Sequence, residues 1–314
     1  MILVFGEALI DFFPASCGQK RGYVPYPGGS PHNVAIGLGR LGIPVMYLGR
    51  LSRDWFGKLL KDSFRESGVD LRYLAEGGEP TALSFIHLNS SKEPDFSFYG
   101  TDTADCKLVP AMIPDPLPAD VAAIHLGSLA MIREPIGSTL TTIAEREHGK
   151  RLISFDPNVR PNHVKDKQSY LKRVEHWLRL SDLIKLSVYD LDYLYPGSTP
   201  DEMAERTLNL GPRLIVVTFG EIGAVAYTAS AKIEVKGKTV EVVDTVGAGD
   251  AFTAGLLGWL YEHDYLRTDR LGVISESELR TALEWATCIA SITCTRIGAD
   301  PPHRAELIEQ SSKF

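Results

Sequence analysis

The chain has 314 residues, of which 44% are hydrophobic and 23% are charged. This composition is typical of a globular protein with a sizeable core, and it excludes intrinsic disorder and fibrous repeats. The 33 basic and 40 acidic residues give a net charge of -7, so the chain lacks the basic surplus on which nucleic-acid binding by counterion release depends. An anionic ligand must therefore be held locally, and we expect no nucleic-acid partner.

Three sequence features indicate the compartment. The four cysteines are too sparse and too unevenly spaced for a disulfide framework or a metal knuckle. The chain opens with MILVFGEALIDFF, where Glu7 and Asp11 interrupt the apolar run and no basic segment precedes it, so we expect no signal peptide. No stretch approaches the roughly 18 consecutive apolar residues of a membrane span. We therefore expect a cytoplasmic protein without a membrane partner.

Short apolar runs alternate with helical periodicity along most of the chain. The runs predict strands at residues 2–5, 45–48, 122–126, 152–155 and 214–219. The periodicity predicts helices over residues 31–41, 54–67, 134–148, 167–180, 200–209, 247–262 and 276–294. This order predicts a single α/β domain over residues 1–314, with a mostly parallel central sheet flanked by helices.

Two stretches break this rhythm. Residues 12–27 are punctuated by Gly and Pro, and residues 81–103 begin with alternating patterns such as TALSFIHL and FSFY. We interpret them as a small antiparallel sheet, built from separate segments, that acts as a lid and excludes water from an active site. The alternative is an additional hairpin without that role. An open sheet of this kind has an edge or apolar face on which a homodimer could form.

The most specific motif is DTVGAGDAF at 244–252, which follows the strand-like VEVV at 240–243 and leads into an apolar helix. Small residues at Gly247, Ala248 and Gly249 let backbone amides at the helix start converge on an anion. Asp250 would lie beside that anion, where it could accept a proton from a hydroxyl that attacks phosphorus. The alternative is a plain capping aspartate after a glycine turn.

DTVGAGDAF resembles DTxGAGDxF, the C-terminal signature of the ribokinase-like sugar kinases of phosphofructokinase B type, and the similarity extends over essentially the whole chain. The resemblance implies a ribokinase-like fold and a kinase that uses ATP. It implies that Asp250 is the catalytic base and that the amides of Gly247, Ala248 and Gly249 form an anion hole.

PYPGGSPHN resembles the N-terminal signature of the same family. Paired glycines let the backbone approach a polyhydroxylated ligand, and an amide both donates and accepts hydrogen bonds. The resemblance implies that Gly28, Gly29 and Asn33 contact the sugar. Asp11, after the first strand, matches the family's aspartate that binds sugar hydroxyls.

Residues 37–42 read GLGRLG, which also fits the dinucleotide-binding pattern of dehydrogenases. That fingerprint needs a strand before it and a helix after it, whereas here a helix precedes and a strand follows. We therefore expect these glycines to pack and end a helix. No GxxxxGK[ST] is present either, which excludes the usual P-loop.

Two segments resemble the family's nucleotide site. VVTFGEIGA at 216–224 is similar to its TxGxxG segment, with Thr218, Gly220 and Gly223 carrying the match. A glycine-containing strand end of this kind is otherwise an ordinary turn. We expect ATP as the phosphoryl donor.

KLSVYDL at 185–191 falls where the family has an N-x-x-E element that organises phosphate and Mg²⁺-bound water. Lys185 and Ser187 are expected on the nucleotide side. Asp190 replaces the longer glutamate and is expected to reach Mg²⁺ through water, because Mg²⁺ usually keeps several of its waters.

A monovalent cation such as K⁺ is held in some family members by two loops. Asp244, Val246 and residues 296–299 correspond to these loops. Backbone carbonyls would be the ligands, so the identity of the side chains says little about this site.

FDPNVRP at 155–161 resembles a segment of bacterial fructokinases and 2-keto-3-deoxygluconate kinases, and Arg160 could contact the substrate there. The alternative role for Arg160 is a structural ion pair. In FYGTDTADCKL at 98–108, Phe98 is expected to contact the sugar from the lid. Gly100 stands where ketodeoxygluconate kinases and many fructokinases have arginine. Losing that cation favours fructose over a sugar acid.

These features together predict an ATP-dependent fructokinase that transfers the γ-phosphoryl group to the 6-hydroxyl of fructose. The alternatives are a kinase for 2-keto-3-deoxygluconate or another small sugar, and a sensor that binds sugar or nucleotide without turnover. The retained Asp250 argues against the sensor.

Overall fold

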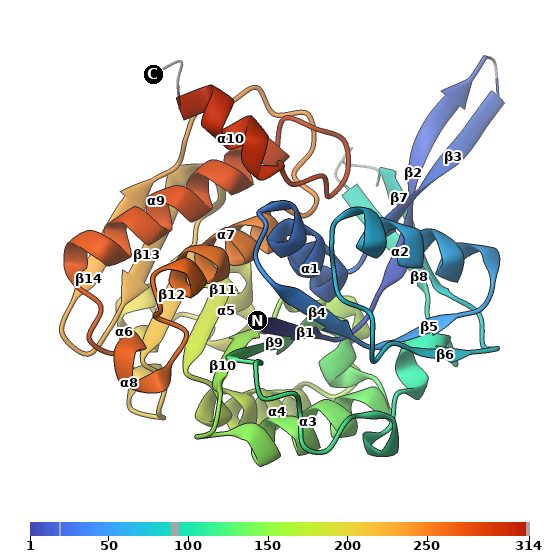
Figure 1. Cartoon of the computed structure of the whole chain (residues 1–314). Coiled ribbons are helices and arrows are strands. Elements are labelled where there is room, and N and C mark those ends of the chain that lie inside the picture. The colour runs from blue at the N-terminus through green and yellow to red at the C-terminus, as the bar shows by residue number, and fades with distance from the viewer. Residues whose placement is uncertain (19, 89–93, 312–314) are drawn as a thin grey trace.

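The structure is a computed structural model that describes residues 1–18, 20–88 and 94–311. In these ranges the main sheet has eight strands in the order β14-β13-β12-β11-β10-β9-β1-β4. Strands β1, β4 and β9 to β12 run parallel, and β13 and β14 add an antiparallel hairpin at one edge (Figure 1). The predicted α/β fold with a mostly parallel sheet is confirmed.

The strands of the main sheet are β1 (Ile2–Phe5), β4 (Val45–Leu48), β9 (Ala123–Gly127), β10 (Leu152–Asp156), β11 (Leu183–Ser187), β12 (Leu214–Thr218), β13 (Gly223–Tyr227) and β14 (Lys232–Lys236). The helices are α1 (Ser30–Arg40), α2 (Trp55–Glu66), α3 (Ile136–Glu147), α4 (Lys167–Leu180), α5 (Val188–Leu194), α6 (Pro200–Leu208), α7 (Ala248–Glu262), α8 (Thr268–Leu271), α9 (Glu276–Thr293) and α10 (Arg304–Ser311). Two short strands, β5 (Arg50–Ser52) and β6 (Ala75–Gly77), pair separately.

Helices cover both faces of the main sheet, so its strands read as continuous apolar runs. Ile2 and Val4 of β1 point into a core shared with α1, α2, α7 and α9. Leu3 and Phe5 point into the opposite core, shared with α3 to α6. Hydrophobic residues are therefore buried on alternate sides of one central strand.

A separate sheet of four strands, called the small sheet below, has the order β3-β2-β7-β8. Its strands are β2 (Leu9–Cys17), β3 (Lys20–Gly28), β7 (Ala82–Leu88) and β8 (Pro94–Tyr99). The β2–β3 hairpin projects from the body of the protein at the upper right of Figure 1. Residue 19 and residues 89–93, which fall within the two predicted segments, lie outside the described residues.

The small sheet differs from the prediction in one respect. Strands β2 and β7 pair in parallel, whereas β2–β3 and β7–β8 are antiparallel. The sheet is mixed because two hairpins from separate segments join through their first strands. The predicted antiparallel sheet is therefore wrong in this pairing.

The strand expected at residues 240–243 is not formed. The amides of Val243 and Asp244 donate to the carbonyl of Cys294 rather than to a strand. Val242 and Val243 are more than half exposed, so the apolar run is not buried in a sheet. The prediction failed because the backbone of this segment bonds to the end of α9 at Cys294, and the chain crosses from β14 to α7 as irregular structure.

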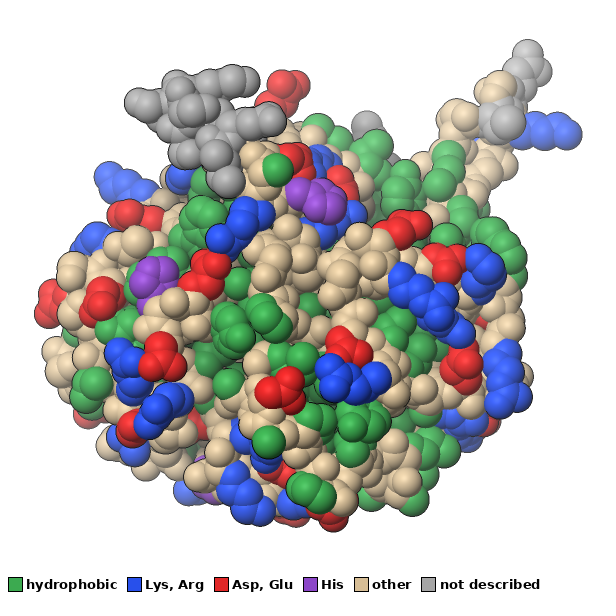
Figure 2. Space-filling model, in the orientation of Figure 1, with side chains coloured by type: hydrophobic (Ala, Val, Ile, Leu, Met, Phe, Trp, Pro, Cys, Tyr) green, Lys and Arg blue, Asp and Glu red, His purple; other side chains and the backbone are tan. Residues whose placement is uncertain are grey.

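The glycines of GLGRLG serve packing, as expected. A Cβ atom on Gly37 would lie 2.6 Å from the Cβ of Ala254, and one on Gly39 would lie 2.1 Å from the carbonyl oxygen of Ser67. Both glycines lie inside α1, so the dinucleotide-binding interpretation is excluded. None of the helices in the described ranges combines the length and the apolarity needed to cross a bilayer. Acidic and basic side chains intermingle over the face seen in Figure 2.

Candidate active site

Helix α7 begins at the predicted anion-binding turn. Gly247 is its N-cap, with a left-handed φ of 76° that favours glycine, and Asp250 lies in the first turn. The amide of Ala248 donates to the carbonyl of Thr245 at 3.2 Å. The amides of Gly249 and Asp250 meet no acceptor within the described part of the chain. These two amides, at the positive end of the helix dipole, are therefore available to an anion.

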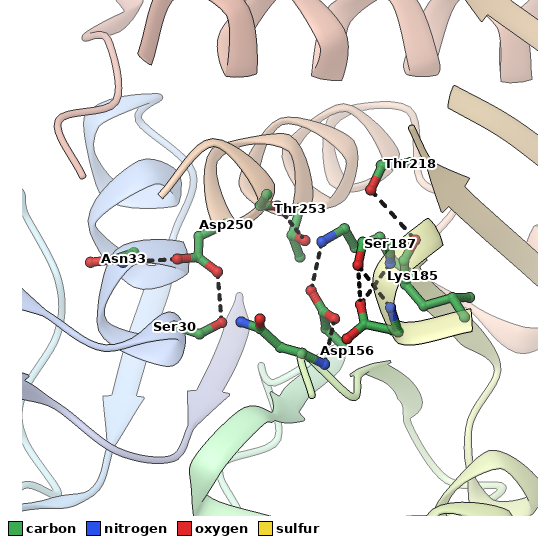
Figure 3. A network of polar contacts seen from close by, with 12 residues as sticks. Ser30, Asn33, Asp156, Lys185, Ser187, Thr218, Asp250 and Thr253 are labelled. Carbon is green, nitrogen blue, oxygen red and sulfur yellow. Dashed lines mark hydrogen bonds and ion pairs between the residues drawn. The ribbon is translucent and has the colours of Figure 1, made fainter. Parts of the chain in front are cut away.

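The carboxylate of Asp250 is held by α1. Oγ of Ser30 donates to Oδ1 at 2.6 Å, and Nδ2 of Asn33 donates to Oδ2 at 2.8 Å (Figure 3). Burial raises the pKa of Asp250, whereas these two hydrogen bonds and the charge of Lys185 lower it. The contacts join the glycine turn of the C-terminal half to the glycine pair of the N-terminal half.

A buried ammonium group lies beside the same turn. Nζ of Lys185, on β11, is 2.9 Å from Oδ2 of Asp156 at the end of β10. A Cβ atom on Gly249 would lie 3.1 Å from this Nζ. Burial alone would lower the pKa of Lys185, but nearby carboxylates, first that of Asp156, raise it above its ordinary value. The ammonium therefore stays charged and adds positive potential next to the available amides.

Ser187 and Asp190 form the capping box that begins α5. Oδ2 of Asp190 accepts from the amide and the hydroxyl of Ser187 at 2.7 and 2.6 Å, and Oδ1 accepts from the amide of Val159 at 2.6 Å. Burial raises the pKa of Asp190, and the charge of Asp156 adds to this effect. Both oxygens already accept hydrogen bonds, so any contact of Asp190 with a metal fits best through water.

The remaining nucleotide candidates follow β12. Thr218 pairs with Ser187 across the two strand ends, so both lie at the carboxyl edge of the sheet. Gly220 begins the turn after β12, with φ of 59° and open space where a Cβ atom would be. A Cβ atom on Gly223 would lie 2.1 Å from the carbonyl oxygen of Val235. Packing against β14 therefore explains Gly223 without a ligand.

One face of the small sheet carries a row of predicted sugar contacts. Asp11 pairs with Tyr26 on one side and with Ser84 on the other, and Ser84 pairs with Phe98. Side chains directly opposite each other in a sheet project from the same face. Asp11 and Phe98 therefore face the same side, although 87 positions separate them in the sequence.

Burial raises the pKa of Asp11 to about 6. A hydrogen bond from Ser84 and the charge of Arg160 lower this pKa, whereas the charges of Asp250 and Asp244 raise it. The pKa of Asp11 therefore depends on groups from both the N-terminal and the C-terminal half of the chain. A Cβ atom on Gly28 would lie 2.1 Å from Oδ2 of Asp11, so any other residue there would displace the carboxylate of Asp11.

Arg160 and Phe98 lie at the outer side of this site. The exposed Arg160 donates through Nη1 to the carbonyl oxygens of Asn158 and Val159, at 3.1 and 3.2 Å. Arg160 has no carboxylate partner among the ion pairs of the described residues, so a structural ion pair does not explain it. The half-buried Phe98 ring meets the His163 ring edge to face, with centroids 5.0 Å apart.

Asp244 ties two loops together. Its Oδ1 accepts from the amide of Val246 at 3.0 Å, and its Oδ2 accepts from the amide of Gly298 at 2.8 Å. A Cβ atom on Gly298 would lie 3.5 Å from the Tyr26 ring and 3.9 Å from the Phe13 ring. The small sheet therefore rests on the loop that Asp244 holds.

Sequence reasoning missed two members of this site. Ser30 follows the glycine pair directly, and a hydroxyl at that place is a signal that could have been used. Asp156 begins the DPN of the acceptor segment, but the sequence does not predict its role. No pattern in the sequence shows that Asp156 pairs with Lys185, 29 residues away. Within the described residues, no group of three or more His, Cys, Asp and Glu side chains could hold a metal by itself.

Comparisons with known proteins agree with this geometry. The model of the pfkB family carbohydrate kinases matches residues 1–305. The chain belongs to this family, which confirms the resemblance drawn from its motifs. A fructokinase of Rhizobium leguminosarum bv. trifolii is 39% identical over 282 residues, which cover 89% of this chain and 86% of the relative.

Solved structures show the same fold. The fructokinase of Xylella fastidiosa with bound ATP has a TM-score of 0.90 and 30% identity, covering 99% of this chain and 98% of that one. The fructokinase of Vibrio cholerae O395, in a form that binds fructose, ADP and a calcium ion, has a TM-score of 0.85 and 27% identity over 98% of this chain and 97% of its own.

Proposed function

We propose that this chain is an ATP-dependent fructokinase that transfers the γ-phosphoryl group of ATP to the 6-hydroxyl of D-fructose. The observation that carries the proposal is the meeting of Asp250 with two available amides and the ammonium of Lys185. A base for the acceptor hydroxyl and positive potential for the transferred group lie at one point. The similarity to fructokinases over nearly the whole chain supports fructose as the acceptor.

In the proposed reaction the sugar is held from the N-terminal half. The ionised Asp11 accepts hydrogen bonds from sugar hydroxyls, and Gly28 and Gly29 let the backbone approach the ring. Asn33, which donates to Asp250, would also contact the acceptor hydroxyl through its amide. Arg160 and Phe98 form the outer wall of the sugar pocket.

The phosphoryl group is transferred at the start of α7. The acceptor oxygen forms a bond to the γ-phosphorus, the bond from that phosphorus to the β–γ bridging oxygen breaks, and ADP leaves. Asp250 takes the hydroxyl proton, and its buried position, which raises its pKa, makes it a stronger base than an ordinary aspartate. The amides of Gly249 and Asp250 and the charge of Lys185 stabilise the transferred negative charge.

We propose Thr218, Gly220 and Ser187 as the nucleotide contacts at the carboxyl ends of β11 and β12. Mg²⁺, when bound with ATP, would neutralise charge on the β- and γ-phosphates, with Asp190 reached through water. K⁺ would be held by backbone carbonyls of the loops that contain Asp244 and Val246, which the side chain of Asp244 keeps in place.

We propose that the small sheet acts as the lid of a single domain. Its inner face carries Asp11 and Phe98, and Tyr26 and Phe13 reach across to Gly298. Closure over the cleft would exclude water that competes with the sugar for the phosphoryl group.

We also propose a homodimer through the outer face of the small sheet. Phe12 and Phe85 stack there with centroids 4.5 Å apart, and Tyr23 and Tyr99 beside them are 47% and 63% exposed. Figure 2 shows hydrophobic side chains on the projecting hairpin, at the upper right. Sedimentation velocity over a range of concentrations tests the proposal, and a constant monomeric mass would contradict it.

A panel of acceptors tests the proposed function. ADP release, measured by a coupled assay with Mg·ATP, is expected to be fastest with D-fructose, and the product should carry phosphate on the 6-oxygen by ³¹P NMR. Higher kcat/KM on 2-keto-3-deoxygluconate would assign the sugar-acid alternative. Binding of fructose and ATP without any phosphorylated product would assign the sensor.

The pH dependence of the reaction should report Asp11. Because its pKa is about 6 and the ionised form binds hydroxyls, kcat/KM for the sugar is expected to fall about tenfold per pH unit below pH 6. At saturating sugar, kcat should show a lower pKa for this group, since bound hydroxyls favour the ionised form. Initial rates from pH 5 to 8 measure both parameters.

The control for this pH effect is Ser84→Ala. The hydrogen bond from Ser84 lowers the pKa of Asp11, so its loss should move the acid limb of kcat/KM to higher pH. An unchanged limb in this variant would assign the titration to another group, such as Asp250.

A further inference from the structure

The Phe98 ring is held in place by a cation. Phe98 lies at the wall of a 560 Å³ cavity formed between the end of β8, the short helix η3 (Ser128–Ile132), and the start of α4. The guanidinium carbon of Arg133, directly after η3, lies 5.3 Å from the centroid of the Phe98 ring. A cation over the face of an aromatic ring is attracted to it, more strongly when water is excluded.

Arg133 is itself fixed by the loop that follows Phe98. Nη1 donates to Oδ2 of Asp105 at 2.5 Å, and Nη2 donates to Oγ1 of Thr103 at 2.6 Å and to the carbonyl of Gly100. The side chains of Arg133 and Asp105 are 12% and 2% exposed. The planar guanidinium group can satisfy these three partners and stack on the ring at once, which an ammonium group cannot do.

Gly100 leaves room for this arrangement. A Cβ atom there would lie 2.2 Å from two carbons of the Phe98 ring and 3.0 Å from Nη2 of Arg133. Any larger residue would have to displace the ring. The place of the ring therefore depends on two neighbours: Gly100, which leaves the space free, and the guanidinium of Arg133, which lies over the ring.

We propose that Arg133 is a positioning residue for the acceptor sugar, which acts by holding the Phe98 ring in its place on the inner face of the small sheet. The proposal rests on the proposed function, in which Phe98 forms part of the wall of the sugar pocket. The guanidinium covers part of the ring. The rest of the ring lies on the same face of the small sheet as Ser84 and Asp11, which is the face toward the sugar in the proposed function. Arg133 thereby sets sugar affinity without a contact to ATP.

Arg133→Met tests the proposal, because methionine keeps apolar bulk and removes the charge. KM for the sugar is expected to rise about 5- to 20-fold. KM for ATP and kcat are expected to stay within about twofold of wild type. The matched control is Arg173→Met. Arg173 lines the same cavity, but it pairs with Glu134 and donates to the carbonyl of Met131, so its loss should leave both KM values unchanged.

A double-mutant cycle with Phe98→Leu separates positioning from a general loss of structure. In the Phe98→Leu background, Arg133→Met should have little further effect on sugar KM. An equal rise in both backgrounds would overturn the proposal, as would equal rises in the KM of sugar and ATP.

Two further variants keep the test decisive if Arg133→Met does not fold. Gly100→Ala displaces the ring without a change of charge and should raise sugar KM alone. Arg133→Lys should give an intermediate rise, and wild-type sugar KM in both variants would overturn the proposal. The kinetics use whichever sugar of the panel the wild-type protein phosphorylates fastest, so failure with fructose rejects the proposed function and leaves the test of Arg133 intact.

Discussion

Asparagine in place of Asp250 is expected to reduce kcat for sugar phosphorylation about 10²- to 10⁴-fold, the contribution usual for a general base. The shape of the side chain is retained, so its oxygen can still accept from Nδ2 of Asn33 while its amide donates to Oγ of Ser30. Because the contacts of sugar and ATP with the rest of the cleft are unchanged, both dissociation constants should stay within severalfold of wild type. Single-turnover kinetics and calorimetric titration measure the two effects separately.

Ser30→Ala is the control for this variant. It removes the 2.6 Å hydrogen bond to Asp250 but keeps the carboxylate, so kcat should fall by no more than about tenfold, the equivalent of a typical hydrogen bond of about 0.5–1.5 kcal/mol.

The Asp250→Asn variant should not be destabilised. Burial raises the pKa of Asp250, which means that burial disfavours the charged form of this side chain. Asp250→Asn should therefore melt at the same temperature as wild type or higher. Turnover close to wild type in this variant would reject Asp250 as the base.

Lys185→Met is expected to destabilise the protein by about 3–5 kcal/mol, the usual result of breaking one side of a buried ion pair. The carboxylate of Asp156, 2.9 Å from Nζ, would lose its partner, and the pKa of Asp250 would rise further because Lys185 lowers it. Activity should fall with stability, since the charge beside Gly249 is lost. Chemical denaturation and steady-state kinetics measure the two losses.

The double variant Lys185→Met/Asp156→Asn distinguishes the two roles of Lys185. Removing both charges should restore much of the stability, because no unpaired charge remains buried. Activity should not return, because the transferred phosphoryl group would still lack the ammonium. Recovery of both properties together would show that Lys185 has a structural role only.

Much of the fold could be predicted because its signals are local. The apolar runs at 2–5 and 45–48 became β1 and β4, and the periodicity at 167–180 became α4. The run at 240–243 did not form a strand, because periodicity registers only apolar character, whereas the backbone partner is set by the fold. Here the amides of Val243 and Asp244 bond to the carbonyl of Cys294 and not to a strand. The parallel β2–β7 pairing joins segments about 70 residues apart, and no local pattern encodes such a contact.

The site was predictable where a motif carried it and not where the fold assembled it. The spacing of residues within the two motifs was enough to predict Gly247, Asp250 and the glycine pair as candidate site residues. The hydrogen bond from Ser30 to Asp250 spans 220 residues, and the ion pair of Arg133 with Asp105 joins the short helix η1 (Ala104–Lys107) to the end of η3. In the sequence, Gly100 indicates only that an arginine is missing. In the fold, Gly100 leaves space for the guanidinium of Arg133, which comes from another segment.

The contact of Tyr26 and Phe13 with Gly298 links two events that are usually treated as separate. The hairpin that carries Asp11 rests on the same loop whose amide is bound by Asp244. If the hairpin opens as the proposed lid, the same movement would withdraw Asp11 from the sugar and remove a contact of the loop at Gly298, which Asp244 ties to Val246. The proposed lid would then couple the sugar pocket to the cation loops through one contact.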